Sequence, residues 1–186
     1  MLKSFLQRKV VVTPVDREYA VVGIDPGING AIAVIQNNLV LSVHDMPVDD
    51  GKVDCKELLK LLTSLRDSPD SPKYFVIEQV PATVGMVGNS ASQFKLGVNY
   101  GKAVACVQAV LMDVADRSMG LISPKKWQYA LGLKEYKESI EFVKGNFINP
   151  HTCQGPRGGW KDGRTDAVCI AYGAYTIIKK GEGCGK

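Results

Sequence analysis

The stretch YAVVGIDPGINGAIAVIQ, residues Tyr19–Gln36, places one carboxylate, Asp25, at the end of an apolar run and follows it with Pro-Gly and Asn-Gly. Short runs rich in Val and Ile on both sides of such turns predict two antiparallel strands, Tyr19–Asp25 and Gly30–Gln36. Taken alone, Asp25 is explained equally well as a turn-forming residue and as a functional one. The rest of the sequence has to decide between these two interpretations.

Composition limits the classes of protein to which this stretch can belong. The chain of 186 residues fits one domain, and 45% hydrophobic with 23% charged residues is typical of a soluble globular protein. No window approaches 18 consecutive apolar residues, so we expect no membrane span. The five cysteines form no CxxC pair, which argues against a disulfide scaffold or a zinc site and favours a reducing compartment, the cytoplasm. A net charge of +4 permits a nucleic-acid partner.

The domain organisation predicted from the sequence is simple. Residues 1–18 are expected to form a flexible arm, and residues 19–186 a single domain without internal repeat or linker. The arm has basic residues and no acid before Asp16, so an organelle-targeting segment is the alternative. Its short length and low serine content favour the arm.

The order of elements predicts the fold. After the first two strands we expect, in chain order, a strand over Leu39–Asp45, a helix over Asp54–Asp67, a strand over Lys73–Val80, a helix over Ser90–Asp116, a strand over Met119–Pro124, two helices over 125–133 and 136–147, a Gly-rich loop over His151–Trp160 and a final helix over Asp162–Lys180. This order indicates an α/β protein with a ribonuclease-H-like fold. Its five-stranded mixed sheet would contain three antiparallel strands and then two parallel ones, flanked by helices.

Four carboxylates from distant parts of the chain share features that suggest one site. In this topology the first strand is central and the fourth is its parallel neighbour, so Asp25 and Glu78 would emerge at the same edge of the sheet. Asp162 and Asp166 are four residues apart and lie on one helix face. Separately, Glu78 reads as a solvated rim residue and Asp162 as a helix N-cap. Together, mutually repelling oxygen donors predict a site for Mg²⁺ or Mn²⁺ and not for zinc.

Three segments resemble a known family. VVGIDPGINGAIAVI, YFVIEQV and DGRTDAVCIAYGAY are similar to the active-site motifs of RuvC-type Holliday junction resolvases, most closely the RuvC-like endonucleases of bacteriophages. SPKKWQYALGL, with Pro124, Trp127 and Gly132, also resembles a segment common in the phage branch. The resemblance extends from about Tyr19 to Lys180.

The resemblance implies a homodimeric, Mg²⁺-dependent endonuclease that nicks two strands of a four-way DNA junction symmetrically. Asp25, Glu78 and Asp166 fall on the family's metal ligands, and Asp162 is the expected fourth. Two metal ions per site would take part, Mn²⁺ could substitute, and no nucleotide cofactor would be needed.

Two positions depart from the bacterial RuvC pattern. Bacterial RuvC proteins carry a base-stacking aromatic residue three positions after the strand-four Glu, where this chain has Pro81. Met86 or Phe94 is the candidate replacement, and a core position is the alternative for Phe94. The final acids are four apart, whereas bacterial RuvC proteins usually have them three apart; the phage-like DGxxD form has this wider spacing.

The predicted DNA surface consists of basic residues, of which the last three flank the acidic motif of the final helix: Lys95, Lys102, Lys125, Lys126, Arg157, Lys161 and Arg164. The Gly-rich loop His151–Trp160 is expected to fold over the DNA or to become ordered with metal. His151 is either a loop residue or a participant, and His44 is interpreted as structural. Because paired nicks require two active sites, a two-fold dimer is expected, with the long helix as its interface.

Other functions remain as alternatives. The first is a nuclease for flaps, forks or three-way branches, and the second is a catalytically inactive junction-binding protein. Actin-like ATPases have a similar Asp-Gly hairpin but need two lobes, which 186 residues do not supply. GVNYGK, Gly97–Lys102, is one residue short of a P-loop and lacks its Ser or Thr, so it is interpreted as part of a helix.

Overall fold

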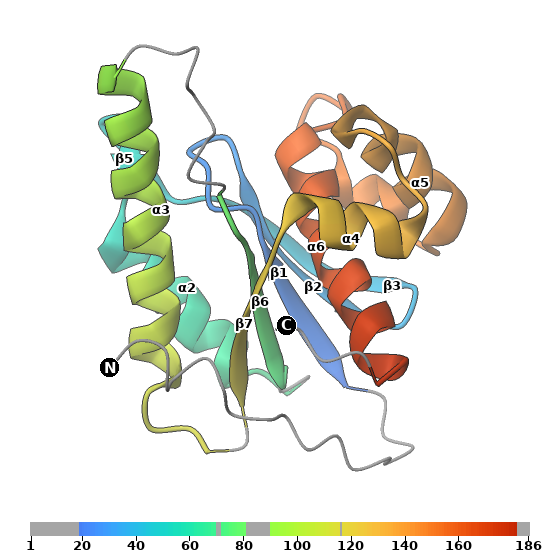
Figure 1. The fold of residues 1–186 in the computed structure, drawn as a ribbon, viewed down its shortest axis with the longest axis horizontal. Helices are drawn as coiled ribbons and strands as arrows, with labels where there is room; N and C mark the ends of the chain where they lie inside the picture. The colour runs from blue at the N-terminus through green and yellow to red at the C-terminus, as the bar shows by residue number, and fades with distance from the viewer. Residues whose placement is uncertain (1–18, 70–71, 81–89, 116, 182–186) are drawn as a thin grey trace.

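One mixed sheet forms the centre of the molecule (Figure 1). A computed structural model of the chain describes residues 19–69, 72–80, 90–115 and 117–181. The strand order is β3-β2-β1-β6-β7, with β1 antiparallel to β2, β2 antiparallel to β3, β1 parallel to β6 and β6 parallel to β7. The strands are β1 (Ala20–Ile24), β2 (Ala31–Gln36), β3 (Leu39–Asp45), β6 (Tyr74–Glu78) and β7 (Ser118–Ile122). The predicted fold class and the central position of the first strand are confirmed.

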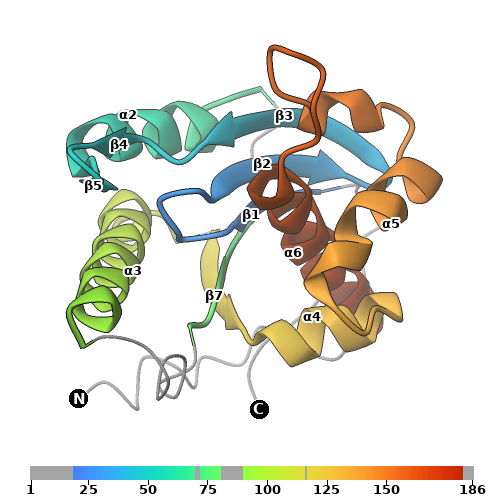
Figure 2. The ribbon, with the colours of Figure 1, turned by 90° about the horizontal axis from the view of Figure 1, so that it is seen from above.

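Helices cover both faces of this sheet (Figures 1 and 2). On one face lie α2 (Cys55–Arg66) and α3 (Ser90–Leu111), and on the other lie α4 (Pro124–Leu131), α5 (Ser139–Asn146) and α6 (Asp162–Lys179). Two 3₁₀ helices, η1 (Tyr136–Glu138) and η2 (Pro150–Cys153), and a small hairpin of β4 (Val48–Asp49) and β5 (Lys52–Val53) complete the described part. None of the helices in the described ranges combines the length and the apolarity required to cross a membrane.

The side chains of the central strands alternate between two apolar cores. Val21 and Val76 pack in the core beneath α6, whereas Ile24 and Ile77 pack in the core beneath α2 and α3. Because both faces are covered, β1 and β2 are apolar almost throughout, as expected for buried central strands. This alternation determines toward which face of the sheet the residue that follows each strand points.

Several predicted boundaries differ from the observed ones. The long helix ends at Leu111 and not at Asp116, because the chain must reverse there to enter β7, which runs parallel to β6. The segment 136–147 divides into η1 and α5, and the hairpin β4–β5 was not predicted. The arm predicted for residues 1–18, together with Pro81 and Met86, lies outside the described residues.

Candidate active site

Asp25 and Glu78 occupy equivalent positions on neighbouring parallel strands. Ile24 is paired with Ile77 in the β1–β6 ladder, so the next residue on each strand is a carboxylate. Adjacent strands lie about 4.8 Å apart. Since Ile24 and Ile77 face the core beneath α2 and α3, alternation directs Asp25 and Glu78 to the opposite face, where α4 and α6 lie.

The turn after β1 is built around the Asp25 backbone. Asp25 Oδ1 accepts a hydrogen bond from Gly27 N at 3.3 Å, and Gly30 N donates to Gly27 O at 2.9 Å. A methyl group at Gly30 would lie 2.2 Å from Asp25 O and 2.8 Å from its Cγ. Only glycine therefore allows β2 to return this close to the carboxylate.

Helix α6 begins against this same turn. A methyl group at Gly163 would lie 2.2 Å from Asn29 O, and one at Gly23 would lie 2.2 Å from Ala167 O. Because glycine has no side chain, the helix backbone can contact β1 and the turn directly. This contact carries Asp166, which is partly buried, to the side of the sheet where Asp25 and Glu78 point.

Glu78 is held by two residues from α4 and η1. Trp127 Nε1 donates to Glu78 Oε1 at 2.7 Å, and the Tyr136 hydroxyl donates to the same oxygen at 2.9 Å. The sequence prediction includes Trp127 only through the resemblance of SPKKWQYALGL and does not include Tyr136 among the site residues. The one signal for Trp127 was a tryptophan in a short helix that also carries Lys125, Lys126 and Gln128, and Tyr136 had no such signal.

The electrostatics of the three inner carboxylates show their mutual proximity. Burial is the largest cause that raises the pKa of Asp166 to about 7; the Ser139 hydroxyl lowers this pKa, and the negative charges of Asp25, Glu78 and Asp162 raise it. Burial likewise raises the pKa of Asp25 and of Glu78, against the lowering effect of their hydrogen bonds. The structure thus brings Asp25, Glu78 and Asp166 together, with exposed Asp162 close enough to influence Asp166.

One buried oxygen at this site lacks a partner. Asp166 Oδ1 and Ser139 Oγ are both buried, and neither makes a hydrogen bond within the described ranges, although the Ser139 hydroxyl is close enough to lower the pKa of Asp166. Buried polar atoms are normally satisfied, so an unpartnered carboxylate oxygen among other carboxylates fits a cation ligand. No three His, Cys, Asp or Glu side chains in the described part converge as a metal site.

Two of the predicted DNA-contacting cations are paired with an acid. Lys161 Nζ lies 2.6 Å from Asp45 Oδ2, and Arg164 donates to both Asp45 oxygens at 2.7 and 3.1 Å. Arg164 also donates to Gln154 O at 2.6 Å. These contacts lower the pKa of Asp45 to about 2, the Arg164 hydrogen bond being the largest cause. Asp45, which the sequence analysis missed, thus ties the end of β3 to the start of α6.

The other predicted DNA contacts are distributed over two faces. Lys125 and Lys126 begin α4, and Arg157 is exposed beside the start of α6. Lys95 and Lys102 lie on α3 across the sheet, where Lys102 Nζ donates to Val53 O at 3.0 Å. Helix α4 starts just after the end of β7, whose last residue, Ile122, pairs with Glu78, so its lysines belong to the same edge of the sheet as Glu78, whereas the lysines of α3 lie across the sheet.

The Gly-rich loop and the histidines complete the surroundings of the site. The loop folds on itself as a tight hairpin, in which Gln154 bridges Trp160 and Gly155 N donates to Gly159 O at 2.8 Å. His151 is exposed. Burial and the Arg164 charge lower the pKa of half-buried His44, which favours the neutral imidazole expected of a structural residue.

The fold and the carboxylate edge define a ribonuclease-H-like α/β protein, and solved structures with the same fold are known. Thermus thermophilus RuvC in complex with a Holliday junction substrate aligns with a TM-score of 0.64 at 16% identity, covering 88% of this chain and 97% of that one. A second structure of Thermus thermophilus RuvC aligns with a TM-score of 0.63 at 17% identity and the same coverage.

A third structural neighbour comes from yeast. The mitochondrial Holliday junction resolvase Ydc2 aligns with a TM-score of 0.56 at 18% identity, covering 96% of this chain and 86% of that one. The sequence matches no model of a known protein family and no curated protein. At these identities the structural likeness establishes the fold, and the function has to be argued from the site.

Proposed function

We propose that this protein is a structure-selective DNA endonuclease that resolves four-way junctions by paired symmetric nicks. The proposal rests on the positions of Asp25 and Glu78, each of which directly follows a residue of the pair Ile24–Ile77 on two neighbouring parallel strands. The unpartnered Asp166 Oδ1 lies on the same side of the sheet. The structural neighbours support the choice of substrate, since one of them, RuvC, is in complex with a Holliday junction substrate and another, Ydc2, is a Holliday junction resolvase.

The chain's own residues have defined roles in this proposal. Asp25, Glu78 and Asp166 would supply the inner oxygen ligands of the cations, and the exposed Asp162 would supply the fourth carboxylate. Mg²⁺, or Mn²⁺ in its place, as two ions per site, would supply the Lewis acid that activates water and stabilises the departing 3′ oxygen. The carboxylates would keep the scissile phosphate in line by fixing the ion positions jointly.

The DNA would be held by cations around this edge. Lys125, Lys126 and Arg157 border the site and are proposed to contact phosphates, joined by Lys161 when DNA displaces it from Asp45. Arg164 is only slightly exposed, and its guanidinium donates to Asp45 and to Gln154 O. Its proposed role is therefore to fix the start of α6 and not to contact DNA. Lys95 and Lys102, across the sheet, would contact a more distant arm of a branched substrate.

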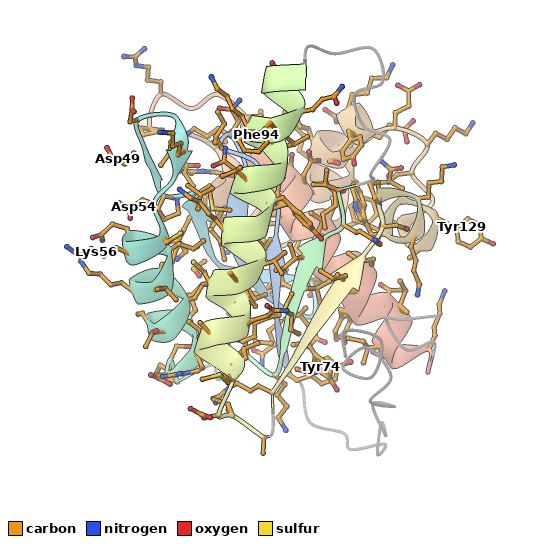
Figure 3. The ribbon with its side chains drawn as sticks, turned by 60° about the vertical axis from the view of Figure 1, so that its left-hand side comes forward. Asp49, Asp54, Lys56, Tyr74, Phe94 and Tyr129 are labelled. Carbon is orange, nitrogen blue, oxygen red and sulfur yellow. The ribbon has the colours of Figure 1, made fainter. Side chains whose placement is uncertain are left out.

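A two-fold dimer is proposed because symmetric nicking needs two sites. The outer face of α3 offers Phe94, which is 74% exposed, and Val98, and Met112, which directly follows the helix, is 77% exposed. Methyl groups at Gly97 and Gly101 would meet nothing within 4 Å, so this face leaves room for a second helix. Figure 3 shows Phe94 on this helix; its exposure excludes a core role and leaves base stacking as its proposed alternative.

Residues 19–186 are proposed to act as a single domain in the cytoplasm. The relationship to the phage enzymes is part of the same proposal.

The experiment that tests the nuclease compares labelled four-way, three-way and flap DNA in Mg²⁺ and in Mn²⁺. We expect paired nicks in the four-way junction. Asp25→Asn should reduce the cleavage rate by more than about 100-fold, because losing a ligand costs more than losing an outer partner of a ligand. Junction binding should survive, since it depends on phosphate contacts elsewhere.

The rival functions give different results in the same experiment. Faster cleavage of flaps or three-way branches would favour the broader branched-DNA nuclease. Binding without cleavage in both metals would contradict the nuclease and favour the inactive junction-binding protein. Equal cleavage by the wild type and Asp25→Asn would show that the carboxylate edge is not the active site.

A further inference from the structure

The Glu78 carboxylate is bound asymmetrically by the protein. Both of its side-chain donors, Trp127 Nε1 at 2.7 Å and the Tyr136 hydroxyl at 2.9 Å, reach Oε1. Within the described ranges no residue donates a hydrogen bond to Oε2. A carboxylate with one oxygen occupied by two donors is fixed in rotation about its last bond, and its second oxygen keeps its lone pairs for another ligand.

The fold builds this arrangement from one buried residue, Trp127, and one residue at the surface, Tyr136. Trp127 is fully buried, and a methyl group at Gly173 would lie 2.8 Å from Trp127 Cβ, so α6 holds the indole in place. Gly132, with φ of 72°, ends α4 in the left-handed conformation and lets the chain turn back. This reversal brings the Tyr136 ring to 5.5 Å from the Trp127 ring in an edge-to-face contact.

Tyr136 reaches the site from the surface. The residue is 44% exposed, yet its hydroxyl contacts the buried Glu78 carboxylate. Burial raises the pKa of Tyr136, and the charges of Glu78, Asp166 and Asp25 raise it further. The hydroxyl donates its hydrogen bond to Glu78 Oε1 and lies close enough to Asp166 and Asp25 for their charges to act on it.

We propose that Trp127 and Tyr136 are positioning residues that fix Glu78 through Oε1 and so present Oε2 to the cation. Trp127 supplies the fixed donor and Tyr136 the one accessible from the surface. The inference rests on the proposed function, because it assigns Glu78 to a metal site. Its physical basis is general: hydrogen bonds from outer residues orient metal ligands and raise their affinity for the ion.

The test uses Tyr136→Phe in the full chain, which removes the donor and keeps the ring that packs on Trp127. We expect its affinity for Mn²⁺, measured by calorimetry, to fall 10- to 100-fold, the usual range for loss of an outer partner. Cleavage should lose kcat while junction affinity is unchanged. A thermal melt in EDTA verifies that the variant is folded.

A matched control is available on the same segment of the chain. Tyr129 is 88% exposed and projects away from the molecule at the right of Figure 3, so Tyr129→Phe makes the same chemical change without touching Glu78. Its Mn²⁺ affinity and cleavage should equal those of the wild type. Because the chain has two tryptophans, a Trp160→Phe background makes Trp127 the only indole and lets its fluorescence follow Mg²⁺ binding. Tyr136→Phe should shift that titration to 10- to 100-fold higher Mg²⁺.

The outcomes separate the inference from the function on which it rests. Wild-type cleavage with unchanged Mn²⁺ affinity in Tyr136→Phe would overturn the positioning role and leave the nuclease intact. Loss of junction affinity with unchanged Mn²⁺ affinity would make Tyr136 a DNA contact and also overturn it. A wild-type protein that neither binds Mn²⁺ nor cleaves DNA would overturn both.

Discussion

At the scale of single residues, the direction of a side chain from its strand decides whether it belongs to the site. Asp25 and Glu78 both follow a residue that faces the core beneath α2 and α3, so both point to the other side. A shift of one residue in the β1–β6 register would turn one carboxylate to the opposite face. Asp166 reaches the same side from α6, where burial raises its pKa to about 7.

The raised pKa of Asp166 predicts how stability depends on pH without metal. Its ordinary value is 3.8, so between that pH and about 7 the folded protein keeps a proton that the unfolded chain releases. The resulting stabilisation is fully present below about pH 4 and is lost as the pH rises through 7. One pKa unit corresponds to about 1.4 kcal/mol, so the loss should reach a few kcal/mol. The raised pKa values of Asp25 and Glu78 act in the same direction.

Thermal unfolding in EDTA between pH 4 and 8 measures this effect. The wild-type melting temperature should fall over this range, and the fall should be much smaller in Asp166→Asn, which has no charge to bury. The rise in the wild-type melting temperature on adding Mg²⁺ should be larger at pH 8 than at any lower pH in this range. Parallel profiles for the two proteins would show that Asp166 is not the group responsible.

At the scale of elements, the site depends on how closely α6 approaches the sheet. Gly23 and Gly163 let its backbone touch β1 and the turn after it. On the other side, Asp45 at the end of β3 binds Arg164 with both oxygens and fixes the first turn of the helix laterally. These contacts determine where Asp166 stands relative to Asp25.

Gly163→Ala tests the close approach of α6. The new methyl group would lie 2.2 Å from Asn29 O and 2.9 Å from Gly30 Cα, both backbone atoms that cannot move aside cheaply. We expect α6 to shift away from the turn, with a loss of about 1–3 kcal/mol in the free energy of unfolding and weaker Mn²⁺ binding. Urea denaturation and calorimetry measure the two effects.

Gly145→Ala is the matched control for this change. Gly145 lies in α5, and a methyl group there would meet nothing within 4 Å. By helix propensity the substitution should stabilise the protein by up to about 1 kcal/mol and leave metal binding unchanged. If Gly163→Ala behaved in the same way, the contact between α6 and the turn would not position the site.

At the scale of the whole molecule, one helix face has no counterpart within the described chain. Ala103 and Val107 of α3 are buried in the core, whereas Phe94 and Val98 of the same helix, and Met112 directly after it, are exposed. An exposed apolar face of this kind is typical of an interface. The proposed dimer would bury it and place two active sites in one particle.

Val98→Glu tests this interface by placing a charge at its centre. We expect the wild-type protein to be a dimer by multi-angle light scattering and the variant to be a monomer, because an unpaired buried charge is strongly unfavourable. Paired nicks on a junction should then become single, uncoupled nicks. Ile148→Glu changes another exposed apolar side chain, outside α3, and should leave the dimer intact. A monomeric wild type would contradict the proposal.

Much of the fold was predictable, because its signals are local. Apolar runs of strand length, the turn glycines and the Asp54 cap, whose side chain accepts from Lys56 N and Glu57 N, all act over a few residues. The division of the segment 136–147 was harder to predict, since a 3₁₀ turn and an α-helix share similar local patterns. The position of Tyr136 depends on its contact with Glu78, which is distant in sequence. The end of α3 was also missed, because the sheet and not the helix pattern dictates where the chain turns back.

The sequence by itself determined most of the strands and helices, the acids at the ends of the first and fourth strands, and the pair Asp162 and Asp166 that opens the last helix. Each of these follows from local propensity or from the period of a strand or helix. The tertiary structure alone decided that Asp45 binds Lys161 and Arg164, that Trp127 and Tyr136 hold one oxygen of Glu78, and that Gly163 admits α6 to the turn. These contacts join residues far apart in the chain, so they exist only once the layers have packed.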